Sequence, residues 1–252
     1  MSESFELSSV LDKYVTKPSA ATKPEFIVLY GRPGGGKTWL AASASELPGV
    51  RKTLILDTEG STVGTLSEFN DDKVDIIRVT SFSMLNAILD KLHDPNAVHE
   101  YDVVIIDTLD KAQKWAVEHY KENAPYTKSG EKDGFWAWGE VSKWTVTTLG
   151  EKLRQAPFLA IVVLHEKEEK NGDGGIVKNL NLQGSAKDDW PGIPDVVAYM
   201  ERKVLDGEPT TLAYFETDDN KVTKNRFKFP AKVIDPTIPK LFAWIDKQKE
   251  DK

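Results

Sequence analysis

Cysteine is absent from this chain of 252 residues. Its absence excludes disulfide bonds, zinc sites with thiolate ligands and catalysis by a cysteine nucleophile, and it agrees with a reducing compartment. Long apolar segments are lacking too, since the longest uninterrupted apolar run, residues 158–164, has seven residues. A helix that crosses a bilayer needs about 20 apolar residues. We therefore expect no membrane association.

The chain also lacks an excess of basic residues. It has 33 Lys and Arg against 40 Asp and Glu, a net charge of −7, which does not favour general nucleic-acid binding. Its first residues, MSESFELSSVLDK, are polar and acidic, so they do not resemble a signal peptide, and we expect a cytoplasmic protein. Only residues 221–232 stand out, with five Lys and Arg and no acid.

Short apolar runs rich in Val and Ile alternate with helix-like segments. Runs of this length are typical of strands buried on both faces of a parallel sheet, and the alternation is typical of βαβ units. The sequence therefore predicts an α/β fold with a mostly parallel sheet flanked by helices. The predicted strands are residues 25–30, 53–58, 74–79, 102–107 and 157–164, and the predicted helices are residues 37–46, 81–92, 108–122 and 138–155.

The pattern changes after residue 164. Residues 199–217 predict a β-hairpin that turns at Asp206–Gly207, residues 222–229 a further strand, and residues 239–250 a closing helix. We expect residues 1–23 to form a flexible arm or accessory segment, and residues 24–252 to form one folded domain.

Residues 31–38, GRPGGGKT, match the P-loop pattern G-x-x-x-x-G-K-[ST] between a predicted strand and a predicted helix. Glycines let successive backbone N–H groups turn toward phosphate oxygens, and a helix N-terminus favours anions. Lys37 would reach the β- and γ-phosphates, and Thr38 would bind Mg²⁺. The residues expected to contact the nucleotide are Gly31, Arg32, Pro33, Gly34, Gly35, Gly36, Lys37, Thr38 and Trp39.

Two acidic residues follow predicted strands downstream of the P-loop. Asp107 ends the apolar segment DVVIID, as a Walker B aspartate does, and would hold Mg²⁺ beside ATP. Glu59 follows the strand 53–58 in the segment LDTEG. A carboxylate beside the γ-phosphate can accept a proton from an attacking water molecule. The alternative is that Glu59 only belongs to an acidic turn.

Several segments resemble known RecA-like ATPases. The segment DTEG resembles the RecA-like recombinases, in which this glutamate polarises the attacking water, so the resemblance makes Glu59 the general base. Over about residues 25–230 the chain resembles the phage RecA-like single-strand annealing ATPases of the Sak group, in the segments YGRPGGGKT, LDTEGS, IIDTLDK, WAWGE and VVLHEK. That resemblance implies ATP hydrolysis, single-stranded DNA annealing and homologous recombination in an infected bacterium, with a phage single-strand binding protein as a possible partner.

The resemblance also implies further site residues. His165 stands where RecA-like proteins place a γ-phosphate sensor, usually glutamine, although a histidine at a strand end can be structural. Lys224 and Arg226 match the K-x-R form of hexameric helicases and clock ATPases, in which both residues reach a neighbouring subunit's γ-phosphate. Alternate residues of a strand share one face, so both could reach one phosphate. This role would require a ring or filament; the alternative is a solvated strand face.

DNA contact is implied for the segment 165–190, which follows the sensor strand. Its lysines could contact phosphates, and nearby aromatic residues could stack on bases. Acidic residues in the same segment weaken the positive electrostatic field of these lysines. The aromatic residues could equally be buried in the protein core. The lysines are Lys167, Lys170, Lys178 and Lys187, and the aromatic residues are Phe135, Trp136, Trp138 and Trp190.

Two other functions remain open. One is a nucleotide-gated assembly or helicase-loading factor without a DNA site of its own. The other is a P-loop kinase for a small molecule, which would need arginines near the phosphates. Kinases of this kind carry an arginine-rich lid over the phosphates, and few arginines are available here to form one, namely Arg154, Arg202 and Arg226.

Overall fold

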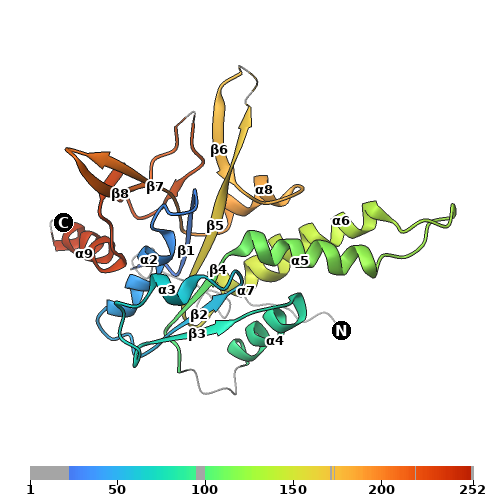
Figure 1. Ribbon diagram of the computed structural model, residues 1–252, viewed down its shortest axis with the longest axis horizontal. Coiled ribbons are helices and arrows are strands. Elements are labelled where there is room, and N and C mark those ends of the chain that lie inside the picture. Colours follow the sequence, from blue (N-terminus) through green and yellow to red (C-terminus); the bar gives the residue numbers. More distant parts are fainter. Residues whose placement is uncertain (1–22, 95–99, 171, 173, 219, 251–252) are drawn as a thin grey trace, which may run out of the picture.

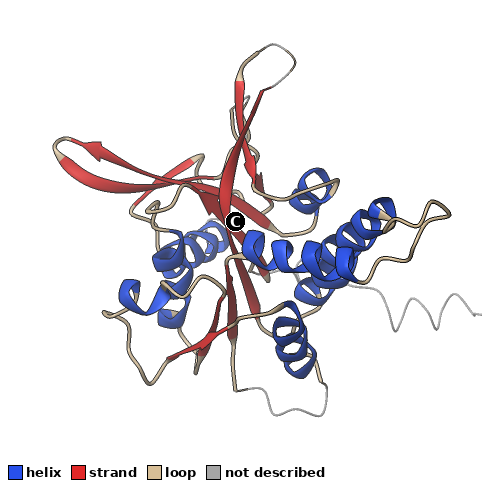
Figure 2. Cartoon of the chain, turned by 45° about the vertical axis from the view of Figure 1, so that its right-hand side comes forward, coloured by secondary structure: helices blue, strands red, loops and turns tan. Residues whose placement is uncertain are grey.

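The computed structural model describes residues 23–250, except for residues 95–99, 171, 173 and 219. The expected N-terminal arm therefore lies outside the described residues, but for its last residue. The described chain forms a central twisted sheet with helices on both of its faces (Figures 1 and 2).

The central strands run parallel, as predicted. Their order in the sheet is β7-β1-β5-β4-β2-β3, with β1 at the middle of the extended sheet. Residues on both faces of β1, β2 and β4 are buried, which explains why these segments read as unbroken apolar runs. The parallel strands are β1 (Phe26–Gly31), β2 (Thr53–Asp57), β3 (Val74–Arg78), β4 (Val103–Asp107), β5 (Leu159–Lys170) and β7 (Val196–Leu205).

The predicted hairpin at Asp206–Gly207 is confirmed. Strand β8 (Glu208–Tyr214) returns antiparallel to β7, and β10 (Lys232–Ile234) extends the sheet beyond β8. Asp206 and Gly207 have φ values of 52° and 87°, the left-handed pair that a tight hairpin turn requires.

The predicted strand over residues 222–229 is wrong. Only β9 (Lys224–Asn225) forms there, antiparallel to the start of β7. The Asn225 side chain donates to the Phe229 carbonyl at 2.8 Å and accepts from the Phe229 N–H at 2.9 Å, which closes a turn. Lys228 has a φ of 57° within this turn, so the chain cannot stay extended.

Helices cover the sheet largely where they were expected. The predicted helix over 37–46 is α2 followed by a 3₁₀ turn (Ser43–Glu46), and the one over 138–155 begins earlier, at Gly134, and contains a π-helical stretch (Trp144–Leu149). Another 3₁₀ turn spans Trp190–Gly192. The helices are α2 (Lys37–Ala42), α3 (Thr62–Thr65), α4 (Phe82–Leu92), α5 (Leu109–Glu122), α6 (Gly134–Lys143), α7 (Gly150–Arg154), α8 (Ala186–Asp189) and α9 (Ile238–Glu250).

Two parts project from this body (Figure 1). Strand β5 continues past His165 and pairs with β6 (Ile176–Leu180) as an antiparallel ribbon. Helices α5 and α6 lie side by side as an arm on another side of the molecule (Figures 1 and 2). Neither projection was predicted.

The core lies in two layers, one on each face of the sheet. Phe26, Val28 and Tyr30 pack on the face covered by α4 and α5, whereas Ile27 and Leu29 pack on the face covered by α2 and α9. The strands are thereby fixed in register, so the carboxyl ends of β1, β2, β4 and β5 meet at one edge of the sheet.

Candidate active site

The register of the sheet brings most of the predicted site residues together. Asp57 pairs with Asp107 across β2 and β4, and Gly31 pairs with His165 across β1 and β5. The segments that follow these strands border a cleft of about 190 Å³. Its lining residues are Pro33, Gly34, Gly35, Gly36, Lys37, Thr38, Trp39, Glu59, Ser61, Thr65, Asp107, Thr108 and His165.

The P-loop wraps one side of this cleft. Gly34 and Gly36 have φ values of 75° and 83°, in the left-handed region that favours glycine, and Gly36 precedes α2 without a side-chain cap. The first N–H groups of α2 therefore have no side-chain acceptor at Gly36. This is the local geometry in which backbone N–H groups bind phosphate oxygens.

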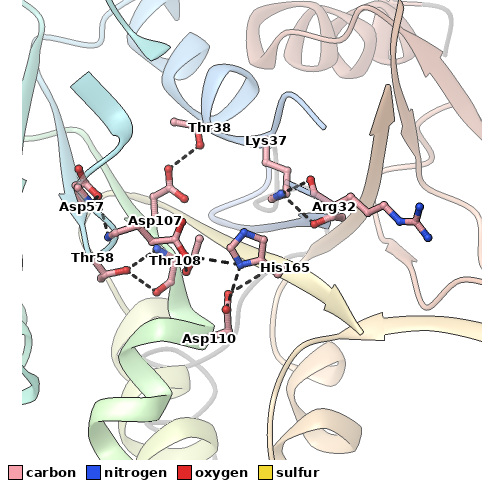
Figure 3. Close-up of polar contacts among 12 residues, drawn as sticks. Arg32, Lys37, Thr38, Asp57, Thr58, Asp107, Thr108, Asp110 and His165 are labelled. Atoms are coloured by element: carbon pink, nitrogen blue, oxygen red, sulfur yellow. Dashed lines mark hydrogen bonds and ion pairs between the residues drawn. The ribbon is translucent and has the colours of Figure 1, made fainter. Parts of the chain in front are cut away.

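Lys37 is held at the mouth of the loop. Its side chain is buried, and its ammonium donates to the carbonyls of Gly31 at 2.9 Å and Arg32 at 2.7 Å (Figure 3). Burial lowers the pKa of Lys37, although the neighbouring Asp107 opposes this shift. A buried ammonium that holds only carbonyl oxygens is well placed to bind an anionic phosphate instead.

Thr38 and Asp107 meet as predicted. The Thr38 hydroxyl donates to Asp107 Oδ2 at 2.7 Å. The pKa of Asp107 is raised to about 6, chiefly because the carboxyl is buried. The hydrogen bond from Thr38 opposes this rise, and the negative charge of Glu59 adds to it. A divalent cation would stabilise the charged form of this carboxylate. Hydroxyl and carboxylate oxygens are the ligands that Mg²⁺ accepts, so this pair fits the expected metal.

The turn that carries Glu59 is built by a residue that the sequence analysis did not single out. Asp57 Oδ1 accepts from the N–H groups of Glu59 at 3.0 Å and Gly60 at 2.6 Å, and Oδ2 accepts from Thr62 at 3.3 Å. Its carboxylate therefore folds the segment after β2 back toward the cleft. The signal was present in the sequence, because an Asp side chain that follows a strand commonly accepts from the backbone N–H two residues on.

Two threonines connect this turn to the end of β4. Thr58 Oγ1 accepts from the Thr108 N–H at 2.8 Å and donates to the Thr108 carbonyl at 3.1 Å. The Thr108 hydroxyl donates to Glu59 Oε1 at 3.3 Å. Glu59 is thus held at the cleft that the P-loop also lines, and its role as the general base stays a prediction.

His165 contacts a buried carboxylate that the sequence analysis also missed. Asp110 accepts from the backbone N–H of His165 at 3.1 Å, and its other oxygen lies 3.1 Å from His165 Nδ1 (Figure 3). The hydrogen bond to Asp110 raises the pKa of His165. Burial acts to raise the pKa of Asp110, but the hydrogen bonds from His165 prevail and lower it. Glu59 Oε1 lies 3.8 Å from the same ring nitrogen.

Arg32 differs from the expectation for a nucleotide-binding residue. Its guanidinium donates to Glu166 at 2.9 Å and to Glu168 at 2.6 Å, both on β5, and Figure 3 shows it pointing away from Thr38 and Asp107. Gly31 and Arg32 do not line the cleft; their carbonyls accept the Lys37 ammonium instead. The structure brings the remaining predicted nucleotide-binding residues, Trp39 included, to the cleft wall.

Lys224 and Arg226 lie at the opposite edge of the sheet. Arg226 donates to Asp195 at 3.0 Å, and Asp195 in turn accepts from the N–H of Phe26 at the start of β1. Lys224 donates to the Gly192 carbonyl, and burial lowers its pKa to about 8. Only Lys224 belongs to β9, so the alternation of a strand does not align the two side chains. Neither residue lines its own cleft, and a role at a neighbour's nucleotide stays a prediction.

The residues considered for base stacking divide into two groups. Trp190 is fully buried and packs edge-on against Phe26 with ring centroids 6.0 Å apart, so its proposed stacking role is wrong. Phe135, Trp136 and Trp138 on α6 are 92%, 38% and 37% exposed.

Most of the lysines considered for phosphate contact already pair with other side chains. Lys167 and Lys187 form ion pairs with Glu169, and Lys178 donates to the Tyr199 hydroxyl at 2.7 Å. Lys170 is exposed. Acidic residues of the segment thus neutralise much of its positive charge.

The arginines considered for a kinase lid do not reach the cleft. Arg154 and Arg226 both pair with Asp195, and Arg202 lies on β7. Among the described residues that line the cleft there is no arginine.

Comparisons with known proteins place the chain in a family. The profile of the AAA domain family AAA_24 matches residues 23–227, most of the chain. A search of curated protein sequences found no match. The predicted α/β fold, a mostly parallel sheet flanked by helices, is confirmed by the observed strand order.

Solved structures resemble the chain at low identity. The RadB recombinase is 13% identical, with 83% of this chain and 85% of that chain covered and a TM-score of 0.49. A KaiC-like protein from Pyrococcus horikoshii OT3 is 13% identical, with 84% and 89% covered and a TM-score of 0.47. The flagellar accessory protein FlaH from Methanocaldococcus jannaschii is 12% identical, with 85% and 87% covered and a TM-score of 0.45.

In the part of the chain that the structure describes, no helix is long and apolar enough to span a membrane.

Proposed function

The chain belongs to the AAA_24 family of AAA domains, and from that premise we propose that it binds ATP with Mg²⁺ and hydrolyses it. The observation that supports this proposal best is that four structural features line one cleft. They are a P-loop, a lysine, a hydroxyl–carboxylate pair and a second carboxylate, Glu59. Phosphoryl transfer needs positioning and charge stabilisation more than covalent chemistry, and these groups supply both.

The P-loop and Lys37 bind the triphosphate in this proposal. The N–H groups after Gly34 and Gly36 surround the β- and γ-phosphates, and the Lys37 ammonium exchanges its carbonyl partners for phosphate oxygens. Thr38 and Asp107 hold Mg²⁺, which neutralises developing charge on the phosphate oxygens when it is bound. Trp39, at the same wall, packs against the nucleotide.

Glu59 is the general base. Its carboxylate lies at the cleft, fixed by the Asp57 turn and by the Thr108 hydroxyl, where it accepts a proton from a water molecule that attacks the γ-phosphate in line. Protonated Glu59 then returns the proton to bulk water after phosphate leaves. Release of inorganic phosphate from Mg-ATP without any added acceptor tests this assignment. A P-loop kinase would instead require a phosphate acceptor.

We further propose that the ATPase acts on single-stranded DNA, in annealing and homologous recombination of the phage type. The resemblance to the Sak group motivates this role, and the exposed aromatic residues Phe135, Trp136 and Trp138 support it, because aromatic rings stack on bases without sequence preference. Filter binding of a labelled oligonucleotide, with and without ATP, tests direct contact. A strand-annealing assay tests the activity.

An assembly or helicase-loading factor without its own DNA site is the second candidate. The observation that favours it is the internal pairing of Lys167 and Lys187 with Glu169, which leaves little charge for DNA on the β5–β6 ribbon. In that case the exposed rings of α6 would bind a protein. Absence of oligonucleotide binding at low salt, with ATP hydrolysis intact, would favour this function.

Self-association is the last part of the proposal. Lys224 and Arg226 lie far from their own cleft, at the amino end of β1, so they can act on a nucleotide only in a neighbouring copy. A ring or filament would bring them there. A subunit-mixing experiment tests this arrangement.

A further inference from the structure

A buried carboxylate directs both of its oxygens at one residue of the cleft. Asp110 lies in the first turn of α5, and its side chain is only 4% exposed. Oδ1 accepts from the backbone N–H of His165 at 3.1 Å, and Oδ2 lies 3.1 Å from Nδ1 of the imidazole. Asp110 does not line the cleft itself, whereas His165 does. Any effect of Asp110 on a bound nucleotide must therefore pass through His165.

This contact fixes the imidazole ring. Because Nδ1 faces the carboxylate, the other ring nitrogen, Nε2, is left for the cleft, and no hydrogen bond joins it to any described residue. In Figure 3 the ring lies between Asp110 and the P-loop residue Lys37. An imidazole held in this way can present one hydrogen-bonding atom in one direction without loss of rotamer freedom on binding.

We propose that Asp110 is a positioning residue that holds His165 so that its Nε2–H donates to a terminal phosphate oxygen of ATP. The inference rests on the proposed ATPase function and adds to it a residue that the sequence analysis did not single out. A phosphate oxygen accepts hydrogen bonds but does not donate them. With Nδ1–H already directed to Asp110, Nε2 can donate only if the imidazole carries both protons.

The surroundings of the ring agree with a cationic imidazole. Asp110 from α5 and Glu59 from the turn after β2 face it with negative charge, and Lys37 from α2 opposes them with positive charge. The two carboxylates prevail, since the pKa of His165 is raised, chiefly by its hydrogen bond to Asp110. The raised pKa favours the cationic imidazole that donation to the γ-phosphate requires.

A purely structural role makes a different prediction. If Asp110 only fastens α5 to β5 through the backbone of residue 165, its loss harms the protein whatever side chain stands there. If it acts through the imidazole, its loss matters only while the imidazole is present. Asp110→Asn keeps the shape of the side chain but leaves one oxygen instead of two and no charge, so the variant side chain cannot accept from both donors of His165.

A double-mutant cycle on phosphate release separates these roles. We expect Asp110→Asn to lower turnover about tenfold, the effect of losing one charge-assisted hydrogen bond. His165→Gln should retain partial activity through its neutral amide. Adding Asp110→Asn to His165→Gln should change turnover by less than about twofold. Glu118→Gln, an exposed change on the same helix, is the control and should match the wild type. A tenfold loss in both backgrounds, or none in the single variant, would overturn the inference.

A spectroscopic readout keeps the inference testable even if a variant folds poorly. The chain has four histidines, so ¹⁵N-labelled histidine resonances of the wild-type protein can be assigned with His165→Gln. We expect Nδ1 of His165 to stay protonated, the pKa of His165 to lie above the ordinary histidine value, and a non-hydrolysable ATP analogue with Mg²⁺ to shift the Nε2 resonance. An Nε2 resonance that the bound analogue leaves unmoved would contradict the proposal. A wild-type protein that binds no analogue at all would instead refute the proposed function itself.

Discussion

The hydroxyl of Thr38 donates a 2.7 Å hydrogen bond to the carboxylate of Asp107, although 69 positions separate the two residues in the chain. The P-loop helix and the end of β4 are joined at this contact. It places the hydroxyl and carboxylate oxygens expected for Mg²⁺ on one side of the cleft, with Glu59 also bordering it.

Removing the P-loop ammonium should abolish nucleotide binding. In Lys37→Ala the β- and γ-phosphates lose their buried cation, and we expect affinity for a fluorescent ATP analogue and phosphate release both to fall at least a hundredfold. Lys73→Ala is a matched control, because Lys73 lies outside the cleft. Fluorescence titration measures the affinity. Near-normal binding in Lys37→Ala would show that the triphosphate lies elsewhere.

The buried Asp107 should make the nucleotide-free protein less stable as the pH rises. Its pKa is raised to about 6 in the folded state, above the 3.8 of an exposed Asp, so the folded state holds this proton more tightly than the unfolded state does. The contribution of Asp107 to stability is therefore greatest below about pH 4, and about 2–3 kcal/mol is lost as the pH rises through 6.

Asp107→Asn removes this charge while keeping an oxygen for the Thr38 hydroxyl. We expect the variant without nucleotide to unfold at a higher temperature than the wild type at pH 7.5, with no such gain at pH 4, and to lose activation by Mg²⁺. Thermal unfolding by circular dichroism at both pH values measures the effect. Equal melting temperatures of the two proteins at pH 7.5 would contradict the assigned environment of Asp107.

Arg226→Ala tests action between subunits. If Arg226 reaches a neighbour's γ-phosphate, turnover should fall by about 10³-fold, the lower end of the range for such residues. Mixing this variant with an excess of inactive Glu59→Gln subunits should restore part of the activity, since each variant supplies the group that the other lacks. Lys247→Ala, an exposed change on α9, is the control. Activity that never rises on mixing would argue against a shared site.

The aromatic residues of α6 should govern contact with single-stranded DNA. Phe135→Ala together with Trp136→Ala should weaken oligonucleotide binding about 30-fold or more, because each lost stack costs about 1–3 kcal/mol. Val204→Ala removes an exposed apolar side chain elsewhere and serves as the control. Filter binding across a salt series checks this, since phosphate contacts make affinity fall with salt. Unchanged affinity in the double variant would show that these rings do not bind DNA, and it would favour a protein partner for α6.

Much of this site could be predicted from the sequence because its signals are local. The P-loop glycines, the apolar strand that ends at Asp107 and the segment LDTEG each specify a short piece of backbone. The parallel sheet then brings their ends together without further information. The hairpin at Asp206–Gly207 was predictable for the same reason, since two residues determine its turn.

What the sequence did not predict depends on contacts between distant segments. The Asp110–His165 pair joins residues 55 positions apart, and no spacing rule connects them. Trp190 resembles any other tryptophan in a polar segment, yet it is buried against Phe26. The strand expected over residues 222–229 ends early because the Asn225 side chain closes a turn onto Phe229. The extension of β5 depends on pairing with β6, and the polar residues of both segments give no strand pattern that would predict this ribbon.

The central claim, that this cleft hydrolyses ATP with Glu59 as the base, is tested most directly by comparing wild-type protein with Glu59→Gln. The account predicts that both bind a fluorescent ATP analogue with Mg²⁺ equally, within about twofold, while phosphate release falls at least a hundredfold in Glu59→Gln. The exposed Glu68→Gln should behave as the wild type. Equal phosphate release by Glu59→Gln and wild type, with binding intact, would contradict the account.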